Sequence, residues 1–326
     1  APLRHGLWVD IWFWSVVRLV SGYCFAVLYV VIESWLNEQA TTETRGAVFS
    51  AYTLITLTVM AGGQQMLLLH PPQQMALFAI ASALVSLAAI PVVLSVAPLP
   101  EHKREKARLD LRRLFRISPA GALGSLAAGL ANGSFWALAA VFIAGYSESV
   151  AHVAWFMTSA VVGGALGQWP LGRWSDRVDR RWVIAFAAGV GMLISLLVFA
   201  FFNHIGTVYL MLLGAAWGAV AFPTYAVSVA HSNDYAKQGE FVMISSGMLL
   251  MYGLGAIFGP LVASGVMSWA GPRGLYLFTA MVHAALLAYV GQRLARRSRE
   301  PEAEHSAFSE SLAATQTASR TYEEEL

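Results

Sequence analysis

The chain has 326 residues, of which 57% are hydrophobic and only 12% charged, and its mean hydropathy is +0.58. A soluble domain carries about 25% charged residues, so this composition excludes an ordinary soluble domain. The formal net charge of +2 is small, and the sequence contains neither a P-loop nor a Rossmann glycine motif. We therefore expect a membrane protein with no nucleic-acid partner.

Nine apolar segments are each long enough to cross a bilayer, which takes about 20 residues in a helix. Outside a closed barrel only helices satisfy their backbone polar groups in hydrocarbon, and the sequence lacks the alternating pattern of barrel strands. The sequence therefore predicts an all-α polytopic membrane protein. In chain order the predicted spans are 11–35, 46–69, 73–97, 119–144, 150–171, 183–202, 207–230, 241–268 and 274–295.

The sequence offers no cluster of groups for catalysis or metal binding. Cys24 is the only cysteine, and no Cys/His cluster has the spacing of metal ligands. A membrane enzyme would need a clustered nucleophile and base, or a set of metal ligands, and the sequence shows neither. We expect no cofactor, no metal and no enzymatic activity.

Lysine and arginine residues are biased to one side of the predicted membrane. Alternating loops place 18 of the 21 on one side and only Arg4 and Arg273 on the other, with Arg18 inside a span. Cytoplasmic loops carry the excess of basic residues. This rule predicts a cytoplasmic C-terminus, and we expect the protein to lie in the inner (plasma) membrane.

The longest connection between spans is basic and flanked by proline, and it divides the chain into two helical units. Within it, Leu111, Leu114 and Phe115 form either a short amphipathic turn on the membrane surface or part of a solvated linker. The tail is polar and is predicted to be disordered. The predicted units are 1–97 with three spans, the linker 98–118, 119–296 with six spans, and the tail 297–326.

An internal repeat relates the two helical units. At a constant offset of 196 residues, Tyr29 matches Tyr225 and Asn37 matches Asn233, and both copies run from a span through a short polar loop to a glycine-rich span. Two parallel six-helix repeats would require three helices before Ala1. We therefore expect nine of twelve helices in this sequence, and a chain without the other three to be inactive as given.

The stretch GRWSDRVDRR, residues 172–181, concentrates four arginines and two aspartates between spans that are almost free of charge. It resembles the cytoplasmic loop motif GxxxDRxGRR of the major facilitator superfamily, with Asp179 in place of the second glycine. The runs VVIESWLN and TRGAVFSAY resemble the YcaD-like branch of that family, and Arg18-x-x-x-Gly22 resembles its fourth-helix motif. The loop residues that match are Gly172, Asp176, Arg177, Arg180 and Arg181.

The resemblance implies a transporter built from two six-helix repeats that works by alternating access. It implies that Asp176 faces the N-terminus of the helix after Arg45, where free N–H groups and the helix dipole favour a carboxylate. Arg45 would add an ion pair. The loop and Arg45 would then form a conformational gate on the cytoplasmic side. In some relatives the fourth-helix arginine is linked to proton coupling, and this role is expected of Arg18.

Arg18 and Glu33 lie in the first span, where a charged side chain costs at least about 2.5–3.5 kcal/mol. With Gly22 and Tyr29 they form one stripe at helical spacing, which predicts a face turned toward the bundle interior. We place Arg18, Tyr29 and Glu33 in the substrate or proton pathway. Two alternatives remain open: Arg18 as a packing or snorkelling residue, and Glu33 at the cytoplasmic mouth.

Asn132 and Trp136 lie one helical turn apart near the middle of the fourth span. An amide beside a large aromatic ring is suited to orienting a small ligand, although an interhelical hydrogen bond with core packing explains the pair equally well. His283 lies in the last span and suits a proton relay, unless it bonds the backbone of a neighbouring helix.

Two glycine clusters are expected where helices approach closely, because small residues let backbones come together. They are Gly163-Gly164-x-x-Gly167 and Gly253-x-Gly255-x-x-x-Gly259. The following Pro260 is expected to bend its helix.

Taken together, these patterns predict a proton-coupled secondary transporter for a small organic solute, working as a monomer in the lipid bilayer. Its expected partners are that solute, H⁺ and lipid. The alternative is a sensor or efflux accessory protein that signals through its cytoplasmic tail, which contains no recognisable docking motif.

Overall fold

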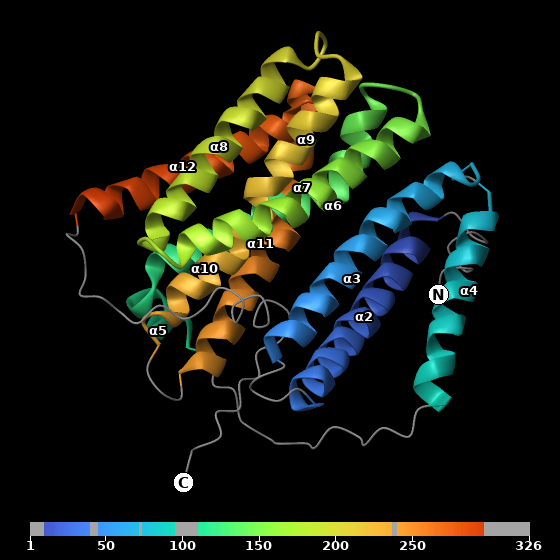
Figure 1. Cartoon of the computed structure of the whole chain (residues 1–326). Helices are drawn as coiled ribbons and strands as arrows, with labels where there is room; N and C mark the ends of the chain where they lie inside the picture. Colours follow the sequence, from blue (N-terminus) through green and yellow to red (C-terminus); the bar gives the residue numbers. More distant parts are fainter. Residues whose placement is uncertain (1–9, 40–44, 72–73, 95–109, 237–239, 297–326) are drawn as a thin grey trace.

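The computed structural model describes residues 10–39, 45–71, 74–94, 110–236 and 240–296 (Figure 1). Every regular element in these ranges is a helix, as the sequence predicts. The elements are α2 (Ile11–Gln39), α3 (Arg45–Gln65), η1 (Met66–Leu68), α4 (Ala76–Leu94), α5 (Leu111–Ile117), α6 (Pro119–Ala144), α7 (Val150–Ser175), α8 (Arg180–Phe201), α9 (Thr207–Ala221), α10 (Pro223–Asn233), α11 (Phe241–Ala270) and α12 (Gly274–Arg296).

Within the described residues, seven helical segments are long and apolar enough to span a membrane. The other two predicted spans also fold as helices. One is α3, and the other is α4, which contains a shorter apolar helix, Ala76–Pro91. The all-α polytopic architecture predicted from the sequence is therefore confirmed. The seven segments are Ile11–Tyr29, Pro119–Ala144, Val150–Ser175, Arg180–Phe201, Thr207–Asn233, Met243–Ala270 and Gly274–Arg296.

The predicted span 207–230 is divided into α9 and α10, which meet at Phe222. Pro223 has no N–H to donate, so the regular hydrogen-bond ladder is interrupted at the carbonyl of Ala219. Phe222 nevertheless keeps right-handed helical angles, with φ −68° and ψ −42°, so the chain continues in nearly the same direction. The two helices together form one membrane-spanning segment.

Close packing in the six-span unit depends on glycine. A Cβ atom added to Gly163 or Gly167 of α7 would overlap the backbone of α9, and one added to Gly255 or Gly259 of α11 would overlap the backbone of α6. These contacts confirm the prediction made for four glycines. Gly253 differs, because a Cβ there would meet nothing within 4 Å. The helix α11 runs through Pro260 without ending.

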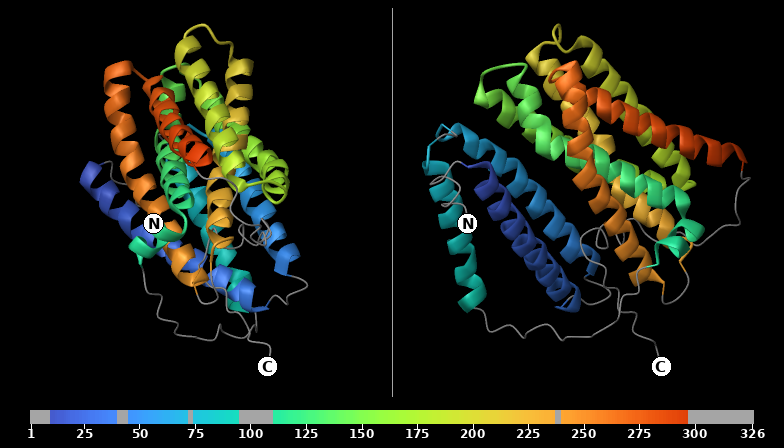
Figure 2. Two further views of the ribbon diagram at one scale, coloured as in Figure 1. Left: turned by 90° about the vertical axis from the view of Figure 1, so that its left-hand side faces the viewer. Right: turned by 180° about the vertical axis from the view of Figure 1, so that it is seen from behind.

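The helices form two groups in space, α2–α4 and α6–α12 (Figures 1 and 2). They meet where α3 approaches α7, at the ends of these helices remote from the loop 172–181. There the Gln65 amide donates a hydrogen bond of 2.6 Å to Thr158 Oγ1. The Thr158 hydroxyl in turn donates a hydrogen bond of 3.3 Å to the carbonyl oxygen of Ala61. This contact connects helices from the two predicted units.

Candidate gating and transport sites

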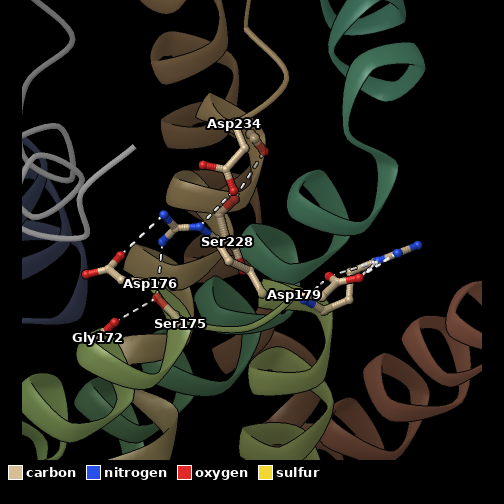
Figure 3. Close-up of polar contacts among 9 residues, drawn as sticks. Gly172, Ser175, Asp176, Asp179, Ser228 and Asp234 are labelled. Carbon is tan, nitrogen blue, oxygen red and sulfur yellow. Dashed lines mark hydrogen bonds and ion pairs between the residues drawn. The ribbon is translucent and has the colours of Figure 1, made fainter. Parts of the chain in front are cut away.

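The loop between α7 and α8 is organised around the buried side chain of Arg180. Its Nε donates to Asp234 Oδ2 at 2.8 Å, and one terminal nitrogen donates to Ser175 Oγ at 3.1 Å (Figure 3). The other terminal nitrogen lies 3.3 Å from Asp176 Oδ1. The Arg180 side chain is 0% exposed, Asp234 4% and Asp176 36%. The guanidinium therefore ties the loop to the end of α10.

Local sequence explains how the loop turns. The helix α7 ends at Ser175, and the N–H of Asp176 donates to the carbonyl of Gly172 at 3.1 Å. Asp179 is the N-cap of α8, where its side chain accepts a 2.9 Å bond from the N–H of Arg181. Its angles of φ −55° and ψ 117° lie in a region open to any residue. Aspartate can therefore replace the family's glycine here and gains a helix cap.

The Asp179 carboxylate also forms an ion pair with the Arg181 side chain, at 2.6 Å between Oδ2 and a terminal nitrogen. Burial raises the pKa of the Asp179 carboxyl, but the hydrogen bonds and charge of Arg181 lower it by more, so the pKa lies below its ordinary value. The carboxylate is thus ionised at neutral pH. Asp179 and Arg181 brace the first turn of α8.

The remaining gate residues are Gly172, which is buried, Arg177 and Arg45. Arg177 is exposed, and the carbonyl of Gly172 accepts a second bond, from Ser175 Oγ at 3.0 Å. Arg45 is the first residue of α3, and its side chain lies outside the part that the structure describes. The expected contact between Asp176 and the start of α3 therefore stays a prediction.

Asn132 and Trp136 lie on α6 beside an aromatic layer. Trp136 stacks on Phe222 with centroids 5.5 Å apart and planes 12° apart. Asn132 is 4% exposed, and its Oδ1 has no hydrogen-bond partner among the described residues. The hydroxyl of Tyr225, one turn beyond Phe222, is also buried without such a partner, and its ring lies 4.8 Å from that of Tyr252.

His283 lies buried in the same bundle, with its ring centroid 6.2 Å from that of Trp217. Its Nδ1 is 2.7 Å from the carbonyl oxygen of Thr279, one turn earlier on α12. The hydroxyl of Thr279 in turn donates to Ser195 of α8 at 3.1 Å. The backbone partner thus belongs to the histidine's own helix, and not to a neighbouring helix as the sequence interpretation suggested. Because a carbonyl only accepts, Nδ1 carries the proton and Nε2 is the basic nitrogen.

The candidate residues of α2 are not brought together with those of α6. Arg18 and Tyr29 are exposed within the described structure, as is Gly22 between them. Glu33 lies on α2, but its side chain is outside the described part of the chain. The assignment of these residues to a substrate or proton pathway stays a prediction.

Two polar contacts were missed in the sequence. Asp234, the buried partner of Arg180, follows the repeat position Asn233, and its counterpart at the offset of 196 is another carboxylate, Glu38. The match of Asp234 with Glu38 was the sequence signal that could have marked Asp234 as a site residue. Gln65, which bonds Thr158, stands beside a second glutamine at a span end, and nothing in the sequence distinguishes the two.

Comparison with known proteins identifies the family. Residues 121–321 match the family described as Major Facilitator Superfamily. An uncharacterized MFS-type transporter of Yersinia enterocolitica is 27% identical over 92% of this chain and 75% of its own length. The MFS-type transporter YcaD of Escherichia fergusonii is 27% identical over 92% of this chain and 77% of its own length. The chain belongs to the Major Facilitator Superfamily, whose members are multi-pass membrane transporters of small molecules and not enzymes.

Proposed function

We propose that the protein is a proton-coupled secondary transporter of a small organic solute that works by alternating access between residues 1–97 and 119–296. The observation that carries the proposal is the oxygen of Asn132, buried without a partner among the described residues. Asn132 stands 13 residues into the 26-residue helix α6, about 20 Å from its start and therefore near the bilayer midplane. A midplane site between repeats is what alternating access requires.

The groups around Asn132 suit a ligand that stacks and forms hydrogen bonds. The stacked rings of Trp136 and Phe222 supply aromatic surface. Asn132 supplies a carbonyl oxygen, and Tyr225 a hydroxyl, that have no hydrogen-bond partner among the described residues. An unpaired buried polar group costs about 1–3 kcal/mol, which a ligand with complementary groups would recover. Asn132 and Trp136 are thus the proposed substrate contacts.

The proposed proton pathway uses Arg18, Tyr29 and Glu33 on α2 together with His283 on α12. His283 has a fixed tautomer with Nε2 available as a base, which supports a role in proton transfer. The proposed gate is the loop 172–181 with Arg45. The positive-inside rule supports a cytoplasmic C-terminus, and we propose that the transporter is a monomer of the inner membrane.

Transport of solutes by reconstituted protein tests the proposal. The protein expressed in full from its gene would be placed in liposomes that contain the pH dye pyranine, and sugars, amino acids, nucleosides and aromatic amines would be added in turn. At least one solute should drive proton movement, and Asn132→Ala should reduce its transport at least tenfold. Transport without proton movement would refute the coupling, and an unchanged rate for Asn132→Ala would refute the site. Gly253→Ala is a suitable control, because a Cβ there meets nothing within 4 Å.

A further inference from the structure

The helix α5 lies directly before α6, and the two share Ser118 as the C-cap of one and the N-cap of the other. The 26 residues of α6 span about 39 Å, whereas the hydrocarbon core of a bilayer is about 30 Å thick. Each end of α6 therefore extends a few ångströms into the headgroup layer. On the predicted topology this places α5 among the headgroups on the cytoplasmic side.

One face of α5 is fixed to the protein. Leu114 is 0% exposed, and a Cβ on Gly247 of α11 would lie 2.9 Å from its Cδ2 atom. Arg113 forms an ion pair with Glu240, and its N–H donates to the capping carboxylate of Asp110 at 2.9 Å. Leu114 thus faces protein, and residues 111–117 form a helix.

The opposite face of α5 is exposed and combines two arginines with an aromatic ring. Arg112, Phe115 and Arg116 are spaced by three and one residues, so they lie within about 100° of the helix circumference. All three are exposed, Phe115 by 38%. None of the ion pairs found among the described residues involves Arg112 or Arg116. In Figures 1 and 2, α5 lies at the edge of its helix group, away from α2–α4.

We propose that this face of α5 binds the headgroup of an anionic phospholipid. Guanidinium groups match the geometry of phosphate and pair with it in a bidentate manner. Phe115, at one edge of this face, would enter the boundary between headgroups and acyl chains, as aromatic residues of interfacial helices do. The anionic lipids of the cytoplasmic leaflet supply the complementary charge. A free phosphate or an acidic protein would leave Phe115 without a partner.

The rigid attachment of α5 makes the site more than a diffuse basic patch. The buried Leu114 and the Arg113–Glu240 pair hold the backbone, so Arg112 and Arg116 approach the lipid already oriented. The bound lipid would in turn hold α5 against the first turns of α6 and α11. This inference does not depend on which solute is transported.

The test is a binding titration of the full-length protein in a neutral detergent with dioctanoyl phosphatidylglycerol, dioctanoyl phosphatidylcholine or inorganic phosphate. The wild-type protein should prefer phosphatidylglycerol to the other two. The double variant Arg112→Gln/Arg116→Gln should bind it about 30-fold more weakly, because each basic residue contributes about 1 kcal/mol near an anionic surface and about 1.4 kcal/mol is a tenfold change.

Two further variants make the test decisive. The pair Arg293→Gln/Arg296→Gln at the end of α12 removes the same charge from another basic site and should leave the affinity within about twofold. Phe115→Ser should weaken phosphatidylglycerol binding and leave phosphate binding unchanged. Equal binding of both lipids, equal loss in the α12 variant, or phosphate binding as strong as that of the lipid would each overturn the proposal. Arg112, Arg116 and Arg296 are exposed and Arg293 is partly buried, and melting temperatures of both double variants in detergent would verify that they fold.

Discussion

Replacing Asp234 by Asn should destabilise the protein more than the same change at any other carboxylate of the 172–181 loop network. The reason is burial: the Arg180 side chain is 0% exposed and that of Asp234 only 4%. Removing one partner of a buried ion pair costs about 3–5 kcal/mol, because the other charge is left without compensation. Asp176 still lies 3.3 Å from Arg180, so we expect a value near the low end, about 3 kcal/mol.

Matched substitutions give the ranking that this reasoning requires. Asp176 is 36% exposed, and exposed ion pairs contribute about 0–1 kcal/mol, so Asp176→Asn should cost less than about 1 kcal/mol. A double-mutant cycle of Asp234→Asn with Arg180→Gln isolates the pair itself. Unfolding in mixed detergent micelles of increasing SDS content would supply the four free energies. A coupling energy under about 1 kcal/mol, or a larger loss for Asp176→Asn than for Asp234→Asn, would refute the argument from burial.

Three further predictions concern the remaining contacts. Asp179→Ala removes a helix cap and should cost about 1 kcal/mol at pH 7. Because the folded-state pKa of Asp179 is lowered, this stabilisation is present above its unfolded pKa of about 3.9 and is lost as the pH falls through the folded value, so the variant and the wild type should converge in acid thermal melts. Gln65→Leu and Thr158→Val both remove the 2.6 Å bond, and each also removes one longer bond, to the carbonyl of Ala154 or of Ala61, so each should speed the labelling of a cysteine introduced at the α3–α7 contact. Asp176→Asn should shift the balance between inward-open and outward-open states, measured by spin-label distances, and leave solute affinity unchanged.

The helices could be predicted because hydropathy is a strong, local signal, and the loop motif because its residues are close in sequence. Asp179 as an N-cap was also within reach, since an aspartate before an apolar run marks a helix start. The repeat marked Asp234 as a matched carboxylate, but its pairing with Arg180 could not be predicted, because the two residues are 54 apart in sequence and only the packing of α10 against α8 brings them together. Long-range pairing of this kind leaves no periodicity in the sequence.

The sequence also did not predict which side of a helix is buried against its neighbours. Leu114 and Phe115 are equally apolar in the sequence, yet one is buried against α11 and the other exposed, which depends on where α11 happens to lie. The same holds for Gly253 and Gly255, of which only the second touches another backbone. Spacing identifies residues that share a face, but the identity of the neighbour comes from the tertiary structure.

The energetics of the loop network support its proposed role as a gate. The pair of Arg180 and Asp234 is buried, and leaving either charge without its partner costs about 3–5 kcal/mol, so we expect the loop to stay attached to α10. Asp176 stands at the exposed edge of the same network, where exchanging one partner for another costs about 1 kcal/mol or less. A gate needs both a fixed attachment to the helices and a contact that forms and breaks at a small cost in free energy. We therefore propose that Asp234 holds the gate loop in place and that Asp176 makes its reversible contact.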